Sequence, residues 1–155
     1  MRVFLSMQMS QLTREQYHLT WARAMELVSV LRRDNEVYFW NEDYPEPPEV
    51  SDESFDASDY LSRIAQADCF VAIVTERVCS SIYLEAGYAL ALRKRSAYYA
   101  TRREVMPLLM RGIAHDDPEV KVVYAQSMDE IIPMVTRIVG NWSGHMRTGK
   151  HLQPT

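Results

Sequence analysis

One acidic side chain in this sequence is well placed to do chemistry at the start of a helix. Residues 69–75 (CFVAIVT) form a continuous apolar run, which is typical of a strand covered on both faces. A short loop leads to Ser80 or Ser81, either of which can cap the next helix, and Glu85 follows in its first turn or just beyond. The helix N-terminus favours the ionised carboxylate, which is the form that attacks a sugar carbon as a nucleophile, whereas an apolar pocket would oppose ionisation.

The residues alone leave other interpretations of this segment open. A glutamate at this position is more often an exposed acid that complements the helix dipole. Gly87 costs roughly 1 kcal/mol relative to alanine inside a helix, which indicates that another backbone or a ligand approaches closely. Helix packing is the more ordinary of these two reasons, but we retain Gly87 as a substrate-binding candidate.

Alternating strand and helix patterns must position these residues. Strands are predicted at 2–6, 36–40, 69–75, 97–100 (with 109 as the furthest end) and 120–124. Helices are predicted at 13–33, 59–67, 81–95 and 128–139. The alternation predicts an α/β fold, flavodoxin-like (Rossmann-like) and doubly wound, with a five-stranded parallel sheet and helices on both faces. We expect one domain over residues 1–142 and a polar, flexible tail over 143–155.

Ligands of such sheets bind beyond the carboxyl ends of the strands, which singles out three loops. The first follows Leu5 and supplies Ser6 and Gln8 as substrate-binding candidates, and the third follows Thr75. The second, 41–58, is too rich in proline and acids for regular structure. Two interpretations of it stay open: a lid that stacks Tyr44 or Phe55 on a base, or a disordered acidic spacer.

Composition argues against several function classes. The formal net charge of −4 gives no reason to expect a nucleic acid polymer or an anionic membrane as partner. No stretch approaches transmembrane length and the first residues lack a secretory pattern, so we expect a cytoplasmic protein. We expect no metal and no cofactor, because the four histidines are scattered and no glycine-rich phosphate loop occurs.

Several motifs follow one another in order around the Glu85 helix. They are Asp59 in a helix, Ala67–Asp68 opening the apolar strand, Ser80–Ser81 in the loop, and an E-x-G-x-A motif at Glu85–Ala89. A later patch, 108–123, reads LLMRGIAHDDPEVKVV. This order resembles the nucleoside 2'-deoxyribosyltransferase superfamily over about residues 56–139, and the later patch is similar to the later strand region of its monophosphate N-glycosidases.

The resemblance implies an activity and a set of roles. Glu85 would attack C1' of a nucleoside or nucleoside 5'-monophosphate, expel the base and form a glycosyl-enzyme intermediate. Water would then complete an N-glycosidase reaction, or a second base would complete a 2'-deoxyribosyltransferase reaction. Asp59 would orient the sugar or assist the leaving base, and Ser80 or Ser81 would hold the sugar or a 5'-phosphate.

Two details bear on those roles. The superfamily's aspartate stands eight residues before Asp68, and here that position is Tyr60, with Asp59 one residue away. One residue is about 100° of rotation on a helix, so the direction of the Asp59 side chain is in question. The cations that could supply charge to a 5'-phosphate are Arg14, Arg93 and Arg111, and Arg111 is the site candidate among them.

Two alternative functions fit the same outline. One is a TIR-like signalling or defence domain that cleaves NAD or senses nucleotides, and the other is a catalytically silent nucleotide-binding module. By resemblance we expect a homodimer or higher homo-oligomer that binds a small nucleoside or nucleotide. The interface candidates are Tyr98, Tyr99 and the helix over residues 83–92.

Overall fold

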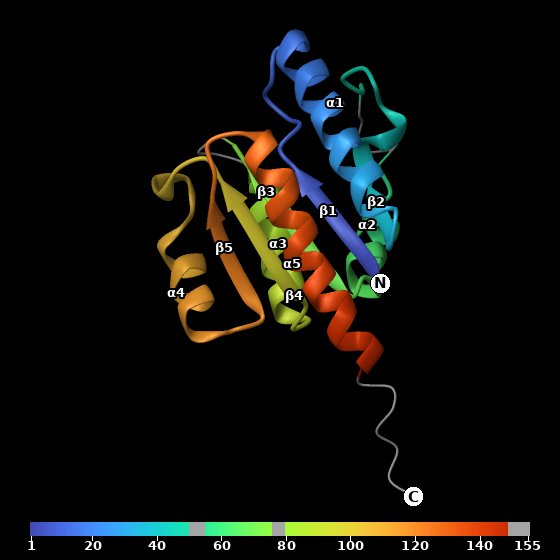
Figure 1. Cartoon of the computed structure of the whole chain (residues 1–155). Helices are drawn as coiled ribbons and strands as arrows, with labels where there is room; N and C mark the ends of the chain where they lie inside the picture. Colours follow the sequence, from blue (N-terminus) through green and yellow to red (C-terminus); the bar gives the residue numbers. More distant parts are fainter. Residues whose placement is uncertain (50–54, 76–79, 149–155) are drawn as a thin grey trace, which may run out of the picture.

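The computed structural model describes residues 1–49, 55–75 and 80–148, and these contain the predicted parallel sheet (Figure 1). Its strands are β1 (Arg2–Met7), β2 (Glu36–Phe39), β3 (Cys69–Val74), β4 (Arg95–Ala100) and β5 (Val120–Tyr124). Their order is β2-β1-β3-β4-β5, and all neighbouring pairs are parallel. The flavodoxin-like, doubly wound architecture is therefore confirmed.

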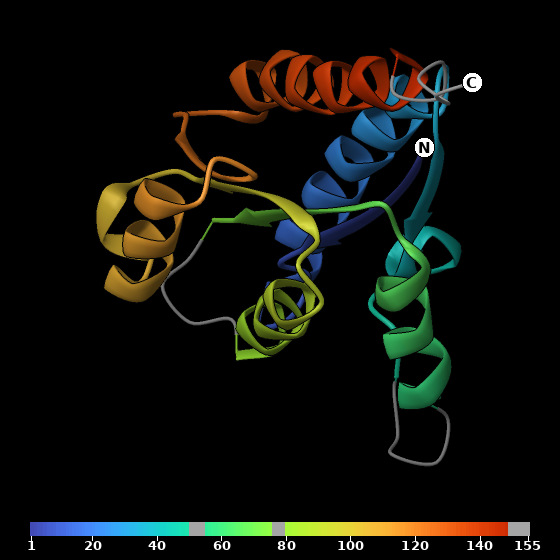
Figure 2. The same cartoon turned by 90° about the horizontal axis from the view of Figure 1, so that it is seen from below.

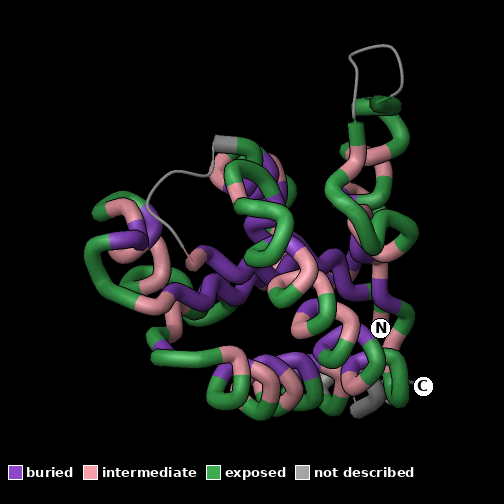
Figure 3. The backbone as a smooth tube through the Cα atoms, turned by 90° about the horizontal axis from the view of Figure 1, so that it is seen from above, coloured by how far each residue is buried: buried purple, intermediate pink, exposed green. Residues whose placement is uncertain are grey.

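Helices cover both faces of this sheet (Figure 2). They are α1 (Arg14–Leu31), α2 (Ala57–Gln66), α3 (Ser80–Ala91), α4 (Leu108–Asp116) and α5 (Met128–Thr148), with short 3-10 helices η1 (Trp40–Asp43) and η2 (Arg103–Val105). α1 and α5 share one apolar core with the sheet, and α2, α3 and α4 share the core on the other face. β3 is buried along its whole length, as its unbroken apolar run predicts (Figure 3).

The segment after β4 differs from the sequence prediction. β4 ends at Ala100, and residues 108–116 form the helix α4 instead of extending that strand. Met110 is buried, and Ile113 and Ala114 pack against the same core. Apolar contacts three and four residues apart are the spacing of a helix, so the prediction of a strand reaching residue 109 is wrong.

The last helix is longer than predicted. α5 runs to Thr148 rather than to about 139, because its buried residues Ile131, Val135, Val139 and Trp142 continue the helical spacing past that point. Residues 143–148 of the expected polar tail thus belong to α5, and 149–155 lie outside the described residues. No helix in the described part of the chain, α5 included, is long and apolar enough to span a membrane.

Two interface candidates on β4 are not at the surface. Tyr98 and Tyr99 are both 0% exposed, and they point into the two opposite cores. Successive side chains of a strand alternate between faces, and helices cover both faces here. The prediction that these tyrosines contribute exposed surface to a subunit interface is wrong.

The winding of the sheet reverses at β1, because β2 lies on one side of it and β3, β4 and β5 on the other. The carboxyl ends of β1 and β3 are adjacent, with Ser6 opposite Ala72 and Met7 opposite Ile73. β1 continues into a helix on one face and β3 into a helix on the other. Their connections separate at that edge, which is where doubly wound sheets bind ligands.

Candidate active site

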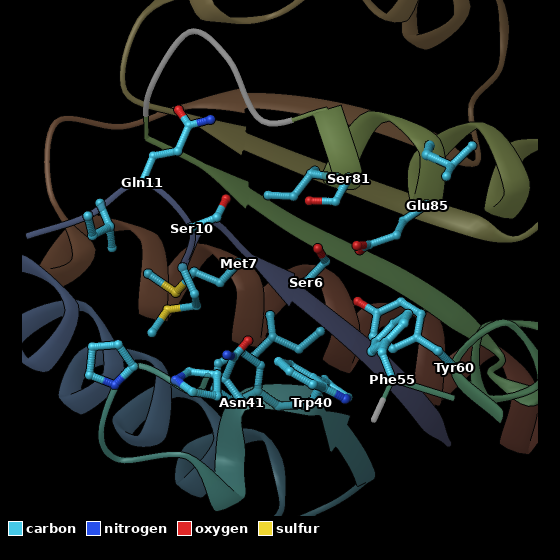
Figure 4. A pocket seen from close by; sticks show the side chains of 18 of the residues that line it. Ser6, Met7, Ser10, Gln11, Trp40, Asn41, Phe55, Tyr60, Ser81 and Glu85 are labelled. Atoms are coloured by element: carbon cyan, nitrogen blue, oxygen red, sulfur yellow. The ribbon is translucent and has the colours of Figure 1, made fainter. Parts of the chain in front are cut away.

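A cavity of about 530 Å³ opens at the carboxyl end of β1, with α2 and α3 contributing to its lining (Figure 4). This volume is in the range that holds a small organic ligand. Most of the lining is apolar, and its hydroxyl and amide groups come from Ser6, Ser10, Gln11, Tyr17, Asn41, Tyr60 and Ser81. Among the described residues that line the cavity, only Glu85 belongs to a charged residue type.

Glu85 reaches the cavity because of the way α3 packs. Ile82, Ala86 and Ala89 are at most 1% exposed and hold one side of the helix in the core. Ser81 and Glu85 are four residues apart, so they share another edge of the helix, and both line the cavity. Glu85 lies in the second turn of α3 and is only 8% exposed.

The Glu85 carboxylate is held between two opposing influences. Burial raises the pKa of this carboxyl above its ordinary value, and hydrogen bonds to the side chains of Ser6 and Tyr60 lower it in part. The Oε2 atom is buried and has no hydrogen-bond partner within the described part of the chain. One carboxylate oxygen is therefore left without a partner at a cavity that can take a ligand (Figure 4).

The two candidate residues at the start of α2 face different ways. Tyr60 lines the cavity, and its side chain forms a hydrogen bond with Glu85. Asp59 is exposed, and its Oδ1 lies 3.3 Å from the Arg63 side chain one turn along the same helix. Asp59 does not line the cavity, so the structure does not support the prediction that it contacts substrate. The reason is the rotation of one residue along the helix, which places Tyr60 on the inner side.

The two candidates from the β1 loop also separate. Ser6 is 4% exposed, lines the cavity and bonds to Glu85. Gln8 is 2% exposed, and its Oε1 accepts a hydrogen bond of 3.4 Å from the hydroxyl of Thr75. Its backbone N–H donates to the carbonyl of Ile73. Gln8 is not among the residues that line the cavity; it joins the ends of β1 and β3.

Of the four remaining candidates, Ser81 is the one that lines the cavity. The side chain of Ser80 lies outside the described residues, although α3 begins there. Gly87 is exposed, and a Cβ added to it would meet no atom within 4 Å, so no neighbouring element in the described part of this chain requires glycine there. Arg111 lies on α4, and Figure 2 shows α3 between α4 and α2, so the predicted contact of Arg111 with substrate is not supported.

An aromatic cluster, of which the sequence singled out only Phe55 as a ring that stacks on a base, lines the cavity opposite α3 (Figure 4). The ring centroids of Trp40 and Phe55 lie 5.6 Å apart with the rings edge to face, and the ring centroids of Phe55 and Tyr60 lie 5.4 Å apart. Trp40 was interpreted as part of a core strand, but β2 ends at Phe39 and Trp40 opens η1. The sequence did contain a signal for Trp40 as a lining residue. It is an aromatic residue directly after a strand, and the carboxyl ends of the strands form the ligand-binding edge of the sheet.

The acidic segment that follows β2 is attached to α1 over its described part. The Tyr17 hydroxyl donates to the carbonyl of Tyr44 over 2.8 Å, and the Trp21 indole donates to the carbonyl of Asn41 over 2.8 Å. Pro47 and Pro48 line the cavity beyond these attachments. Residues 41–49 therefore form a wall of the site, whereas 50–54 lie outside the described residues; Tyr44 stacks on Trp40 rather than lining the cavity.

Comparison with known proteins finds similarity at the level of structure. No family model matches the sequence, and no curated protein matches it. A CMP N-glycosidase of Clostridium botulinum, BcmB, is similar over 87% of this chain and 97% of its own, with a TM-score of 0.61 and 19% identity. A 2-deoxyribosyltransferase of Bacillus psychrosaccharolyticus is similar over 85% of this chain and 90% of its own, with a TM-score of 0.59 and 17% identity.

A third solved structure, a conserved protein of Enterococcus faecalis V583, covers 88% of this chain and 97% of its own with a TM-score of 0.56 and 9% identity. At such identities the likeness establishes the fold. The chain has the fold of the nucleoside 2'-deoxyribosyltransferase superfamily, as its motifs implied.

Proposed function

We propose that this protein is an enzyme that cleaves the N-glycosidic bond of a nucleoside or nucleoside 5'-monophosphate, with Glu85 as the nucleophile. One observation carries the proposal: a buried carboxylate, that of Glu85, belongs to a residue that lines a ligand-sized cavity across from an aromatic cluster. The activities named for two proteins with the same fold, a CMP N-glycosidase and a 2-deoxyribosyltransferase, support the reaction class.

The geometry suggests how the reaction would proceed. A base stacks against Trp40, Phe55 and Tyr60, which places C1' of the sugar near Glu85. An oxygen of the Glu85 carboxylate forms a bond to C1' as the bond from C1' to the base nitrogen breaks, and the base leaves with that electron pair and takes a proton from water.

The resulting glycosyl ester on Glu85 is then resolved. Water attacks C1' and gives up a proton to the solvent, the bond between C1' and the Glu85 oxygen breaks, and Glu85 regains its carboxylate, so the anomeric configuration is retained overall. A second base in place of water gives a new nucleoside and makes the enzyme a transferase. The hydrogen bonds to Ser6 and Tyr60 orient the carboxylate and favour its ionised form throughout.

The test is a chromatographic assay with a panel of ribo- and deoxyribonucleosides, their 5'-monophosphates and NAD. Wild type is expected to release a free base, and Glu85→Gln to lower that rate by about a thousandfold or more, since the amide is a poor nucleophile. Glu104→Gln, in the exposed η2, is the matched control and keeps wild-type activity.

Each other outcome of this assay contradicts the proposal. Release of nicotinamide alone would assign the chain to the NAD-cleaving class. Binding of nucleotides without any turnover by wild type would leave a binding module, and Glu85 would lose its role.

We also propose that two copies of the chain associate through the outer face of α3. This face carries apolar and small side chains that are accessible to solvent. Leu84 is 73% exposed, and a Cβ added to Gly87 would have no neighbour within 4 Å. Glycine on an exposed helix face is explained if another helix packs there. Leu84 also lines the cavity, so a second copy on this face would border the site.

A further inference from the structure

The charge distribution around the cavity bears on which substrate it takes. Among the described residues that line it there is no lysine, arginine or histidine, and Glu85 contributes a negative charge when ionised. A phosphate group carries roughly −1.5 to −2 charges at neutral pH and needs cationic or multiple N–H partners when it is removed from water. The described lining supplies no cationic partner for such a group.

Three arginines, on α1, at its C-terminal cap and on α2, are already paired with acids. Arg14 lies 2.9 Å from Glu46, which also contacts His18. Arg63 lies 3.3 Å from Asp59 and over the ring of Tyr38. Arg32 forms two hydrogen bonds to Glu42. None of these three arginines lines the cavity, so none is placed to bind a phosphate there.

One part of the cavity offers neutral polar groups instead. Ser10, Gln11 and Ser81 lie on the side of the cavity away from Tyr60 and Phe55 (Figure 4). Gln11 has a φ of 62°, a left-handed conformation that side-chain-bearing residues rarely adopt, and its side chain lies at the cavity. A disfavoured backbone at a site is a reason to look for a ligand contact. Amide and hydroxyl groups suit the hydroxyls of a sugar.

The N-terminus of α3, in contrast, favours the binding of a phosphate, because a helix N-terminus attracts anions. Its dipole amounts to about half an elementary charge. The Glu85 carboxylate, when ionised, carries a full negative charge one turn further along the same helix edge. When ionised, this carboxylate repels an anion and so opposes the attraction of the helix dipole.

We infer that the substrate is a nucleoside without a phosphate, whose sugar end lies against Ser10, Gln11 and Ser81 while its base stacks on the aromatic cluster. This inference rests on the proposed function and narrows it. It separates this chain from the similar CMP N-glycosidase, whose named substrate carries a phosphate.

The test compares kcat/KM for each nucleoside with that for its own 5'-monophosphate. We expect the nucleoside to be at least about tenfold better, since a like-charge contact disfavours the monophosphate. A better monophosphate would overturn the inference while the proposed function stands. If neither compound of any pair loses its base, the proposed function fails and the inference fails with it.

A second, independent test introduces a positive charge at Gln11, where the sugar end is proposed to lie, and measures the preference between nucleoside and monophosphate. Gln11→Lys is expected to improve the monophosphate relative to the nucleoside by about tenfold, because it adds the missing cation. Gln11→Met, similar in length and neutral, should leave the ratio of the two substrates unchanged. An unchanged ratio in the lysine variant would show that the 5' end does not lie at Gln11.

Arg77 belongs to the segment between β3 and α3 that is outside the described residues, so it receives its own control. Arg77→Ala is expected to leave the ratio of nucleoside to monophosphate activity unchanged. A loss of monophosphate activity confined to this variant would overturn the inference.

Discussion

At the scale of single residues, the protein holds Glu85 in a state that is costly for folding and useful for attack on a sugar carbon. Burial favours its protonated form, and hydrogen bonds to Ser6 and Tyr60 favour its ionised form. If Glu85 is the nucleophile, as we propose, it must be ionised to act, so the acidic limb of the pH–activity profile should report this balance.

Removing one of the hydrogen bonds should move that limb in a defined direction. Tyr60→Phe deletes an interaction that lowers the pKa of Glu85, so the acidic limb of kcat/KM should shift to higher pH. Tyr38→Phe is the matched control, since the Tyr38 ring lies 6.4 Å from the Tyr60 ring but does not line the cavity. A limb that stays in place in Tyr60→Phe would contradict the assignment of Glu85 as the ionising group.

The same pKa shift predicts how stability depends on pH. Above the ordinary pKa of glutamate the unfolded chain loses this proton, whereas the folded chain keeps it up to the raised pKa. The folded state then binds more protons, so its stability falls as pH rises through that window. Glu85→Gln removes the effect.

We would measure the free energy of unfolding by urea titration at several pH values. The difference in this free energy between Glu85→Gln and wild type should shift in favour of the variant as pH rises. The gain should level off above the raised pKa. An advantage that shrinks with rising pH would show that the carboxylate is stabilised, not destabilised, by its surroundings.

At the scale of elements, α1 fixes the acidic segment that walls the cavity. The Tyr17 hydroxyl donates to the Tyr44 carbonyl and is 3.4 Å from the side-chain amide of Asn41. Tyr17→Phe leaves that carbonyl without its partner, so we expect a loss of about 1 kcal/mol in unfolding free energy. KM should rise with little change in kcat, because the wall loosens but Glu85 stays in place.

Tyr124→Phe, which removes a half-exposed hydroxyl on the edge strand β5, is the control for this change. It should alter neither stability nor KM. Equal effects of the two substitutions would mean that the contact between Tyr17 and the segment after β2 does not hold the wall.

At the scale of the whole molecule, the outer face of α3 distinguishes a monomer from a dimer. In a monomer, Gly87→Lys should stabilise the protein by roughly 0.5–1 kcal/mol, because glycine is a poor helix former and the added side chain meets open space. In the proposed dimer the lysine would be forced into the interface and separate the subunits. Light scattering after gel filtration distinguishes the two.

Gly112→Lys is the matched substitution on α4, where a Cβ likewise meets nothing within 4 Å. It should stabilise each subunit without changing the molar mass. Dissociation by Gly112→Lys alone would move the interface to α4, and a wild type that is monomeric at all concentrations would contradict the dimer.

The sequence by itself determined the order of the five strands, four of the five described α-helices and the location of the nucleophile candidate. The unbroken apolar run of β3 predicted a strand buried on both faces, and the apolar spacing in α1 predicted its helix within about two residues at each end. These features are local: they follow from periodicity and from capping, as at Thr13, whose side chain accepts from the backbone of Gln16. Ser6 was found because the carboxyl ends of parallel strands meet at one edge. Ser81 and Glu85 were found because they lie near the start of the helix that follows β3 and match motifs of the superfamily that the sequence resembles.

The tertiary structure alone decided which side chains at that edge face the cavity. A rotation of about 100° per residue separates Asp59, on the surface, from Tyr60, beside Glu85, and no sequence pattern fixes the phase of a ten-residue helix with one buried residue. Trp40, Phe55 and Asn41 are brought opposite α3 from distant parts of the chain, and Arg111 is kept away by α3. These are relations between elements, and they exist only once the cores on the two faces of the sheet set each helix in place.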